Sequence, residues 1–82
     1  MSTMTVIAQV KPEKQQEFRQ AINSLSSDME AEEEGLKKSQ LYQEVDKTHG
    51  FRLITEWKTG KDLEAYLRPE KFSVLLGAIQ VL

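Results

Sequence analysis

Apolar and polar residues alternate along residues 51–58 of the chain, which is the pattern of a β-strand that buries one face. One face of this strand carries Phe51, Leu53, Thr55 and Trp57. The opposite face carries Arg52, Ile54, Glu56 and Lys58. Thr59 then stands where a helix N-cap belongs, and Asp62 lies three residues on, as in a capping box. The pattern therefore predicts a strand that leads directly into a helix.

A first strand is predicted at the start of the chain, from Thr3 to Val10. Apolar residues occur on both of its faces, with Val6 and Ala8 on one face and Ile7 on the other. Strands that are apolar on both faces are typical of sheet interiors, so we expect an inner strand. Pro12 ends the strand and fits the first turn of a helix, because a proline there loses no hydrogen bond.

The next predicted element is a helix from Pro12 or Glu13 to about Glu30. Its apolar stripe has spacings of four, three and four residues and consists of Phe18, Ile22, Leu25 and Met29. Carboxylates crowd its C-terminal end in the run 30–34, where negative charge opposes the helix dipole. We therefore expect the helix to end before Glu33 and Gly35 to make the turn.

Residues 36–45 also alternate but are more polar, which favours a strand near a sheet edge. A turn at residues 46–50 joins it to the strand at 51–58 as a hairpin. A helix from Gly60 to Leu67 follows, with Leu63 and Leu67 expected to point inward. Pro69 interrupts this helix and can open another, whose apolar stripe starts at Phe72.

The predicted order is β-α-β-β-α, with the last helix in two pieces. This order predicts an α+β fold, the ferredoxin-like split βαβ sandwich without its final strand. Either residues 78–82 supply a very short fourth strand, or that strand lies beyond the residues given. We favour the second alternative, because helical spacing continues to the end of the chain.

Composition and charge narrow the class of protein. Eighty-two residues predict one domain, residues 1–82, with a core small enough to gain from association. The net charge is −2, and no basic cluster with interleaved aromatics suggests nucleic-acid binding. Without cysteines there is no disulfide framework or thiolate metal site. No signal-peptide pattern or membrane-spanning run is present, so we expect a soluble cytoplasmic protein that does not bind a membrane.

Several stretches together resemble the antibiotic biosynthesis monooxygenase family of dimeric α+β barrels. The stretches are MTVIAQVKP at 4–12, GLKKSQLYQEVD at 35–46, FRLITEWK at 51–58, DLEAYL at 62–67, and Phe72. The resemblance implies a ferredoxin-like protomer and a homodimer in which two sheets face each other to close a barrel. It also implies a pocket between sheet and helices in each protomer. Some members oxidise quinols, anthrones or similar aromatics with O₂ and without metal or flavin, whereas others degrade haem.

The chain departs from this family at residues that matter for the chemistry. Tyr66 and Lys71 stand where quinol-oxidising members often carry histidines, and no histidine follows His49 as a ligand for haem. The resemblance thus implies a cofactor-independent monooxygenase that acts on a small aromatic such as a quinol. The alternative is a non-catalytic dimeric barrel that binds an apolar small molecule or acts as an interaction module.

Three residues are candidates for a catalytic role. Trp57 would form an aromatic wall of the pocket and aim its indole N–H at a bound oxygen, unless it is simply a core residue packed on Leu63 and Phe72. Tyr66 would replace the family's histidine as a hydrogen-bond donor, unless its hydroxyl lies in water. His49 is the only histidine of the chain, the residue type best suited to take a substrate proton at neutral pH, although a predicted hairpin turn suits a solvated histidine.

Further residues are candidates for binding. Leu63 and Phe72 would line the pocket, and Arg52 would bind an anionic group. A cross-strand ion pair with Glu44 would also explain Arg52. The acidic run 30–34 lacks the framework of a calcium loop, and no histidine pair has metal-ligand spacing, so we expect neither a metal nor another cofactor.

Overall fold

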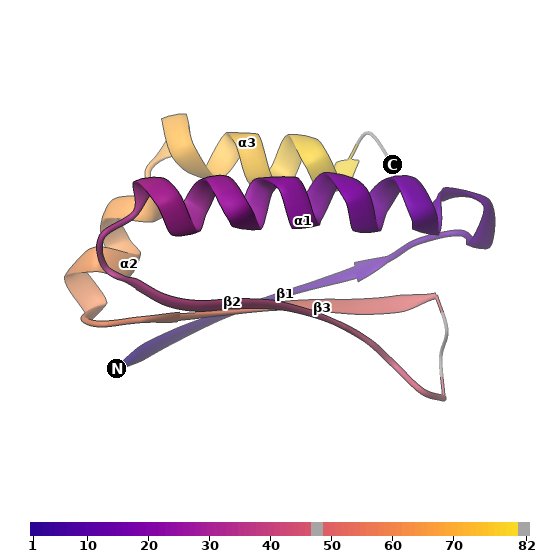
Figure 1. Cartoon of the computed structure of the whole chain (residues 1–82), viewed down its shortest axis with the longest axis horizontal. Coiled ribbons are helices and arrows are strands. Elements are labelled where there is room, and N and C mark those ends of the chain that lie inside the picture. Colours follow the sequence, from indigo (N-terminus) through magenta and orange to yellow (C-terminus); the bar gives the residue numbers. More distant parts are fainter. Residues whose placement is uncertain (47–48, 81–82) are drawn as a thin grey trace.

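A computed structural model describes residues 1–46 and 49–80 of the chain. The elements follow the predicted order: β1 (Ser2–Gln9), the short 3₁₀ helix η1 (Pro12–Lys14), α1 (Gln15–Glu32), β2 (Leu36–Gln43), β3 (Gly50–Trp57), α2 (Gly60–Tyr66) and α3 (Pro69–Gln80). Helices α1 and α3 lie side by side on one face of the sheet, and α2 closes one end (Figure 1). The ferredoxin-like α+β prediction is confirmed.

The sheet has the strand order β1-β3-β2, and both pairings are antiparallel. Among the described strands β3 is therefore the inner one and β1 lies at an edge, contrary to the expectation of an inner first strand. Ile7 explains the error, because its side chain points away from the helices and is 60% exposed. Strand β2 lies at the other edge, as its polar content predicted. A bulge between Leu36 and Lys38 interrupts its pairing with β3.

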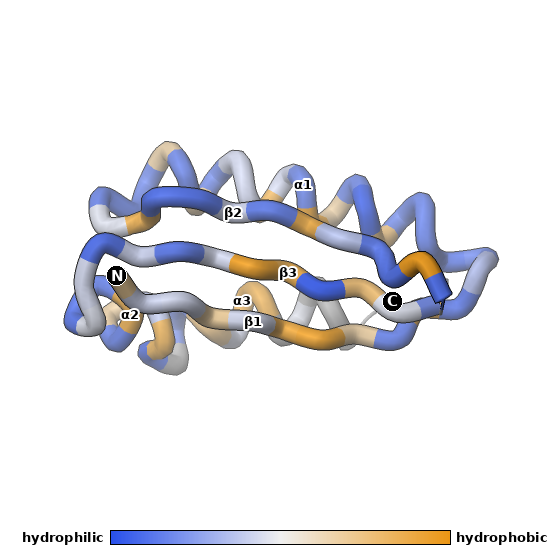
Figure 2. Tube along the Cα trace, turned by 90° about the horizontal axis from the view of Figure 1, so that it is seen from below, coloured by the Kyte–Doolittle hydropathy of each residue, from blue (hydrophilic) through white to orange (hydrophobic). Residues whose placement is uncertain are grey.

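The core lies between the sheet and the helices. Every apolar position of the inward face of β3 is buried, and Phe51 packs on Phe18 of α1 with ring centroids 5.1 Å apart. The predicted stripe of α1 faces the sheet, with Phe18, Ile22 and Met29 buried and Leu25 packed against them. None of the described helices covers the opposite face of the sheet, as the view from below shows (Figure 2).

The ends of the elements show where local sequence signals held. Helix α1 ends at Glu32, as the crowding of carboxylates predicted. Thr59 caps α2, because its Oγ1 accepts a 3.2 Å hydrogen bond from the backbone N–H of Asp62 and donates to the Asp62 carboxylate at 2.8 Å. The inward placement of Leu67 was wrong, since this side chain is 42% exposed just beyond the last residue of α2.

The structure also tests three further boundary predictions. Strand β2 ends at Gln43, and Val45, which we placed in it, is 92% exposed. Gly35 has no positive φ, so the turn after α1 does not depend on a left-handed glycine. Residues 78–80 continue α3 and supply no strand, as the favoured alternative of continued helical spacing predicted. Residues 47–48 of the predicted turn and 81–82 of the candidate fourth strand lie outside the described residues.

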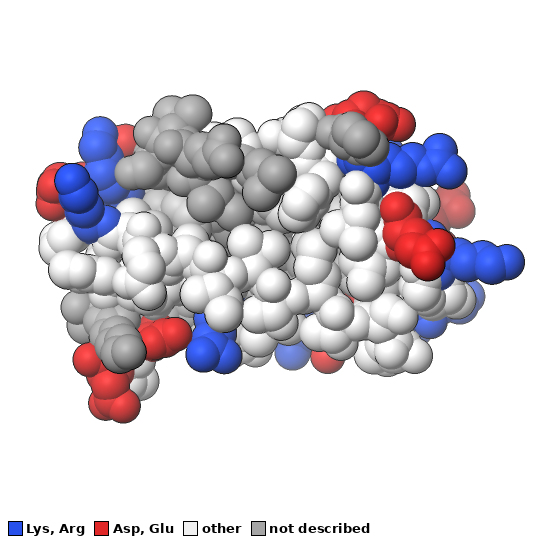
Figure 3. All heavy atoms as spheres, turned by 180° about the vertical axis from the view of Figure 1, so that it is seen from behind, with Lys and Arg blue, Asp and Glu red and all other residues white. Residues whose placement is uncertain are grey.

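The side of the molecule that carries β1 and α3 has little charge at its middle. Seen from behind, the described charged side chains gather toward the two ends, and the described residues between them are mostly uncharged (Figure 3). Within the described ranges, no helix is both long and apolar enough to cross a bilayer.

Candidate functional site

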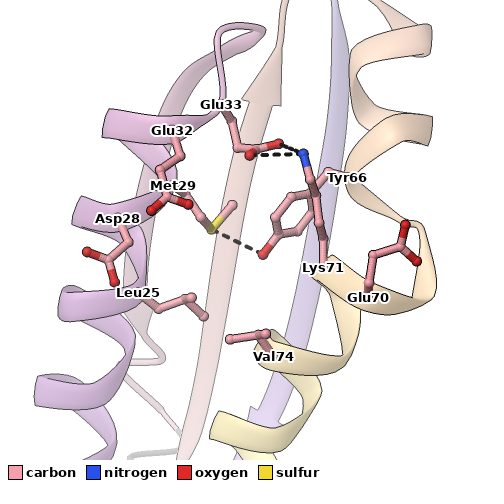
Figure 4. Close-up of a pocket in the computed structure, with 9 residues that line it drawn as sticks. All are labelled: Leu25, Asp28, Met29, Glu32, Glu33, Tyr66, Glu70, Lys71 and Val74. Carbon is pink, nitrogen blue, oxygen red and sulfur yellow. Dashed lines mark hydrogen bonds and ion pairs between the residues drawn. The ribbon is translucent and has the colours of Figure 1, made fainter.

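A pocket opens between the C-terminal half of α1 and the junction of α2 with α3 (Figure 4). Its volume is about 220 Å³. The lining combines apolar side chains with a charged mouth and consists of Leu25, Asp28, Met29, Glu32, Glu33, Tyr66, Glu70, Lys71 and Val74. An apolar cavity of about 150 Å³ is enough to bind benzene. The pocket thus has room for a small aromatic ring system but is smaller than the roughly 300–1,000 Å³ of sites for drug-sized ligands.

Tyr66 brings the main polar group into this pocket. It is the last residue of α2, only 3% exposed, and its hydroxyl donates to Met29 Sδ at 3.4 Å. A thioether sulfur is a weak acceptor, so this hydroxyl is held by little hydrogen-bond energy. The expectation that the hydroxyl would lie in water was wrong. A ligand oxygen that displaced the sulfur would be a better acceptor for the same proton.

Trp57 lies directly behind Tyr66 and fixes its ring. The two ring centroids are 5.2 Å apart with an interplanar angle of 33°, a favourable aromatic contact. Trp57 is 1% exposed, and its Nε1 donates to Thr55 Oγ1 at 2.9 Å. The indole N–H is therefore directed to the protein interior. Trp57 is a core residue that supports the pocket wall from behind.

The protonation state of Tyr66 follows from its surroundings. Burial raises the pKa of the phenol above its ordinary value of about 10, and the negative charge of Glu33 raises it further. Both effects disfavour the tyrosinate. At neutral pH the Tyr66 hydroxyl is consequently a hydrogen-bond donor that keeps its proton.

An ion pair spans the mouth of the pocket between α1 and α3. Lys71 Nζ lies 2.9 Å from Glu33 Oε1 and 3.2 Å from Oε2. The Glu33 side chain is 13% exposed and that of Lys71 is 47% exposed. This contact joins the C-cap of α1 to the first turn of α3.

The remaining candidates from the sequence lie outside the pocket lining. Leu63 and Phe72 are partly buried and pack against the core. Arg52 is on the uncovered face of the sheet, where Nε lies 3.4 Å from Glu44 Oε1, the ion pair weighed as its alternative role. His49 is exposed in the turn before β3. The eight residues of β3 separate it from the Trp57 end by about 26 Å at about 3.3 Å per residue.

Several lining residues were missed or given another role. Met29 was assigned to the core first, and the carboxylates of the acidic run to solvent. A signal for them was present, because Leu25, Asp28, Met29, Glu32 and Glu33 recur at helical spacing on one face of α1. What the sequence did not reveal is that α3 lies against this face. Among the described residues, no group of three or more histidine, cysteine or acidic side chains is placed to hold a metal ion.

The sequence profile of antibiotic biosynthesis monooxygenases matches residues 1–75. The chain belongs to this family. None of the proteins of curated function matches it significantly.

Three solved structures illustrate the similarity. A conserved protein of Methanosarcina mazei Go1 is 29% identical, with a TM-score of 0.78 over 95% of this chain and 76% of that one. A candidate antibiotic biosynthesis monooxygenase of Nitrosomonas europaea is 24% identical, with a TM-score of 0.78 over 98% of this chain and 83% of that one. Another structure, of an antibiotic biosynthesis monooxygenase, is 20% identical, with a TM-score of 0.77 over 99% of this chain and 84% of that one. The last two similarities concern the fold alone.

Proposed function

We propose that this protein is a monooxygenase that acts on a small aromatic such as a quinol and needs no metal, haem or flavin. The observation that carries the proposal is a buried tyrosine hydroxyl directed into a largely apolar cavity of aromatic-ring size. Membership of the family supports an oxygenase over other enzyme classes. The substrate class comes from the resemblance and from the size of the cavity.

The proposed reaction begins with loss of a proton from the substrate hydroxyl. The resulting anion transfers one electron to O₂, and the two radicals combine at a ring carbon. One oxygen atom remains on the ring and the other leaves as water, so a quinol and O₂ give a hydroxyquinone and water. Stabilising the substrate anion is the step that the protein can assist most directly.

We assign the role of donor to Tyr66, which would donate to the substrate oxygen in place of Met29 Sδ. We assign the role of proton acceptor to Glu33. This carboxylate lines the mouth of the pocket, and its negative charge already raises the pKa of Tyr66. Trp57 would act as a positioning residue behind Tyr66. Leu63 and Phe72 would shape the pocket from the core side.

Oxygen uptake with a panel of hydroquinones and anthrones tests the proposal. We expect uptake above the rate without enzyme, and Tyr66→Phe should lower it by about 100-fold, the usual effect of removing one donor to a developing oxyanion. Tyr42→Phe is the matched control, because Tyr42 is 43% exposed on β2, away from the pocket. No uptake above background with any substrate would contradict the proposal.

The second candidate is a non-catalytic dimeric barrel that binds an apolar small molecule or serves as an interaction module. It is favoured by the absence of histidine from the lining and by a Tyr66 that keeps its proton. Mass spectrometry of a ligand incubated with the protein under O₂ distinguishes the two. Recovery of the bound ligand unchanged supports this candidate, whereas an added oxygen atom supports the oxygenase.

We also propose that two protomers associate through the uncovered faces of their sheets. Ile7 is 60% exposed and Tyr42 is 43% exposed. Both pair with Arg52 of β3 and so lie on the face of the sheet that no described helix covers (Figure 2). Light scattering should give about twice the 9.4 kDa mass of one chain. Ile7→Glu should shift the mass toward the monomer, and Val45→Glu, a change at a residue 92% exposed beyond β2, should not. A monomeric wild-type protein at micromolar concentration would contradict this proposal.

A further inference from the structure

The charges that line the pocket are unequal in sign. Four carboxylates, those of Asp28, Glu32, Glu33 and Glu70, belong to the lining together with a single ammonium group, that of Lys71. The ammonium is already paired with Glu33. Asp28, Glu32 and Glu70 are exposed side chains, and none of them has a basic partner among the described ion pairs. Among the described lining residues, the charge of Lys71 is thus balanced by Glu33, and the other three carboxylates give the pocket entrance a net negative charge.

The interior of the pocket has a different character. Met29 and Leu25 supply apolar surface inside the pocket, Val74 supplies more at its rim with 58% exposure, and the Tyr66 hydroxyl is the buried donor (Figure 4). Asp28 and Glu32 come from α1, whereas Glu70 comes from the opposite side on α3. A ring that fills the apolar part and accepts a hydrogen bond from Tyr66 would thus lie between acidic residues of α1 and of α3.

We propose that the pocket selects small phenols whose side chain carries a positive charge, such as an aryl-alkylammonium, and disfavours those that carry a carboxylate. The inference rests on the proposed function only in placing the phenol oxygen at Tyr66. Charges of one sign around a cleft with low-dielectric walls focus the potential and raise the local concentration of the opposite charge. The ammonium would remain partly solvated near the entrance, so no charge needs to be buried.

Three phenols of similar size provide a test on the full chain. Tyramine carries an ammonium, para-ethylphenol is neutral, and para-hydroxyphenylpropionate carries a carboxylate. Calorimetric titration at low salt should give the tightest binding for tyramine and the weakest for the propionate. Each should differ from para-ethylphenol by about threefold, the size expected for partly exposed charges. At about 1 M salt, where the screening length falls to about 3 Å, the three affinities should converge.

Glu32→Lys reverses one charge of the lining without threatening the fold, because a cation at the end of α1 is favourable to the helix dipole. It should lower tyramine affinity and raise that of the propionate by about threefold each. Glu13→Lys makes the same change in net charge at the other end of the helical segment. That position is about 28 Å from Glu32 at about 1.5 Å per residue. Glu13→Lys should leave the order of the three affinities and the ratios between them unchanged.

The outcomes separate this inference from the proposed function. Equal binding of the three phenols at low salt overturns the charge selection but leaves the pocket as an aromatic site. An identical effect of Glu32→Lys and Glu13→Lys also overturns it, since the preference would then come from net charge alone. Failure of all three phenols to bind overturns both the selection and the assignment of this pocket.

Discussion

The indole Nε1 of Trp57 donates a 2.9 Å hydrogen bond to Thr55 Oγ1, two residues earlier on the same strand. Both side chains are buried, with exposures of 1% and 0%. Thr55 in turn reaches the carbonyl oxygen of Met4 on β1 at 3.5 Å. A buried polar pair on the inward face of β3 thereby fixes the ring against which Tyr66 packs.

Thr55→Val should leave the indole N–H of Trp57 buried without an acceptor. We expect a loss of about 1–3 kcal/mol in the free energy of unfolding, measured by urea denaturation. Thr55→Ser is the control, because it keeps the hydroxyl and removes only a methyl group. The NMR resonance of the indole proton should shift in Thr55→Val and remain near its original position in Thr55→Ser. An unshifted resonance in the valine variant would argue against this hydrogen bond.

The raised pKa of Tyr66 predicts a specific loss of stability at alkaline pH. The unfolded chain releases the phenol proton near pH 10, whereas the folded chain holds it to higher pH. The stabilisation is therefore complete below about pH 10 and is lost as pH rises through the folded-state pKa. In Tyr66→Phe the free energy of unfolding, measured by urea denaturation, should lack this decrease between neutral and strongly alkaline pH. The Tyr42→Phe variant should still show the decrease.

The ion pair between Glu33 and Lys71 should contribute modestly to stability. Because the Lys71 side chain is about half exposed, we expect a coupling free energy of about 0.5 kcal/mol from a double-mutant cycle with Glu33→Gln and Lys71→Gln. Near 1 M salt the coupling should fall close to zero. A coupling that is large and independent of salt would show that the pair is shielded from solvent, contrary to its exposure here.

Gly35 should be sensitive to substitution for a reason unrelated to φ. A Cβ added there would overlap the side chain of Asp62, the residue that bonds Thr59 at the start of α2. Gly35→Ala should thus lower the free energy of unfolding by about 1–3 kcal/mol, the range found for overpacking. Gly77→Ala is the matched control, since a Cβ at that position of α3 meets no described atom within 4 Å. Its expected effect is a gain of up to about 1 kcal/mol from helix propensity.

Much of the fold was predictable because its signals are local. The alternation at 51–58 assigned every side chain of β3 to the correct face, and Thr59 with Asp62 marked the start of α2. The order of the strands was harder, since apolar residues on both faces of the first strand do not show which strands pair with it. The edge position of β1 is a property of the whole sheet.

The site was less predictable because it joins distant residues. The sequence identified Tyr66 and noted Lys71, but the partner of Tyr66 lies 37 positions away in α1 and that of Lys71 lies 38 away. These contacts arise because the end of α2 and the start of α3 pack beside α1, which no local spacing reveals. Trp57 was weighed as both a pocket wall and a core residue, and only the position of Thr55 shows where its N–H is directed.

The stack of Trp57 on Tyr66 gives the molecule a built-in optical reporter. The chain contains a single tryptophan, so all of its indole emission comes from this one buried ring. Any compound that enters the pocket and moves the Tyr66 ring alters the surroundings of that fluorophore. Occupancy of the pocket can thus be read from the unlabelled protein, before any turnover is known.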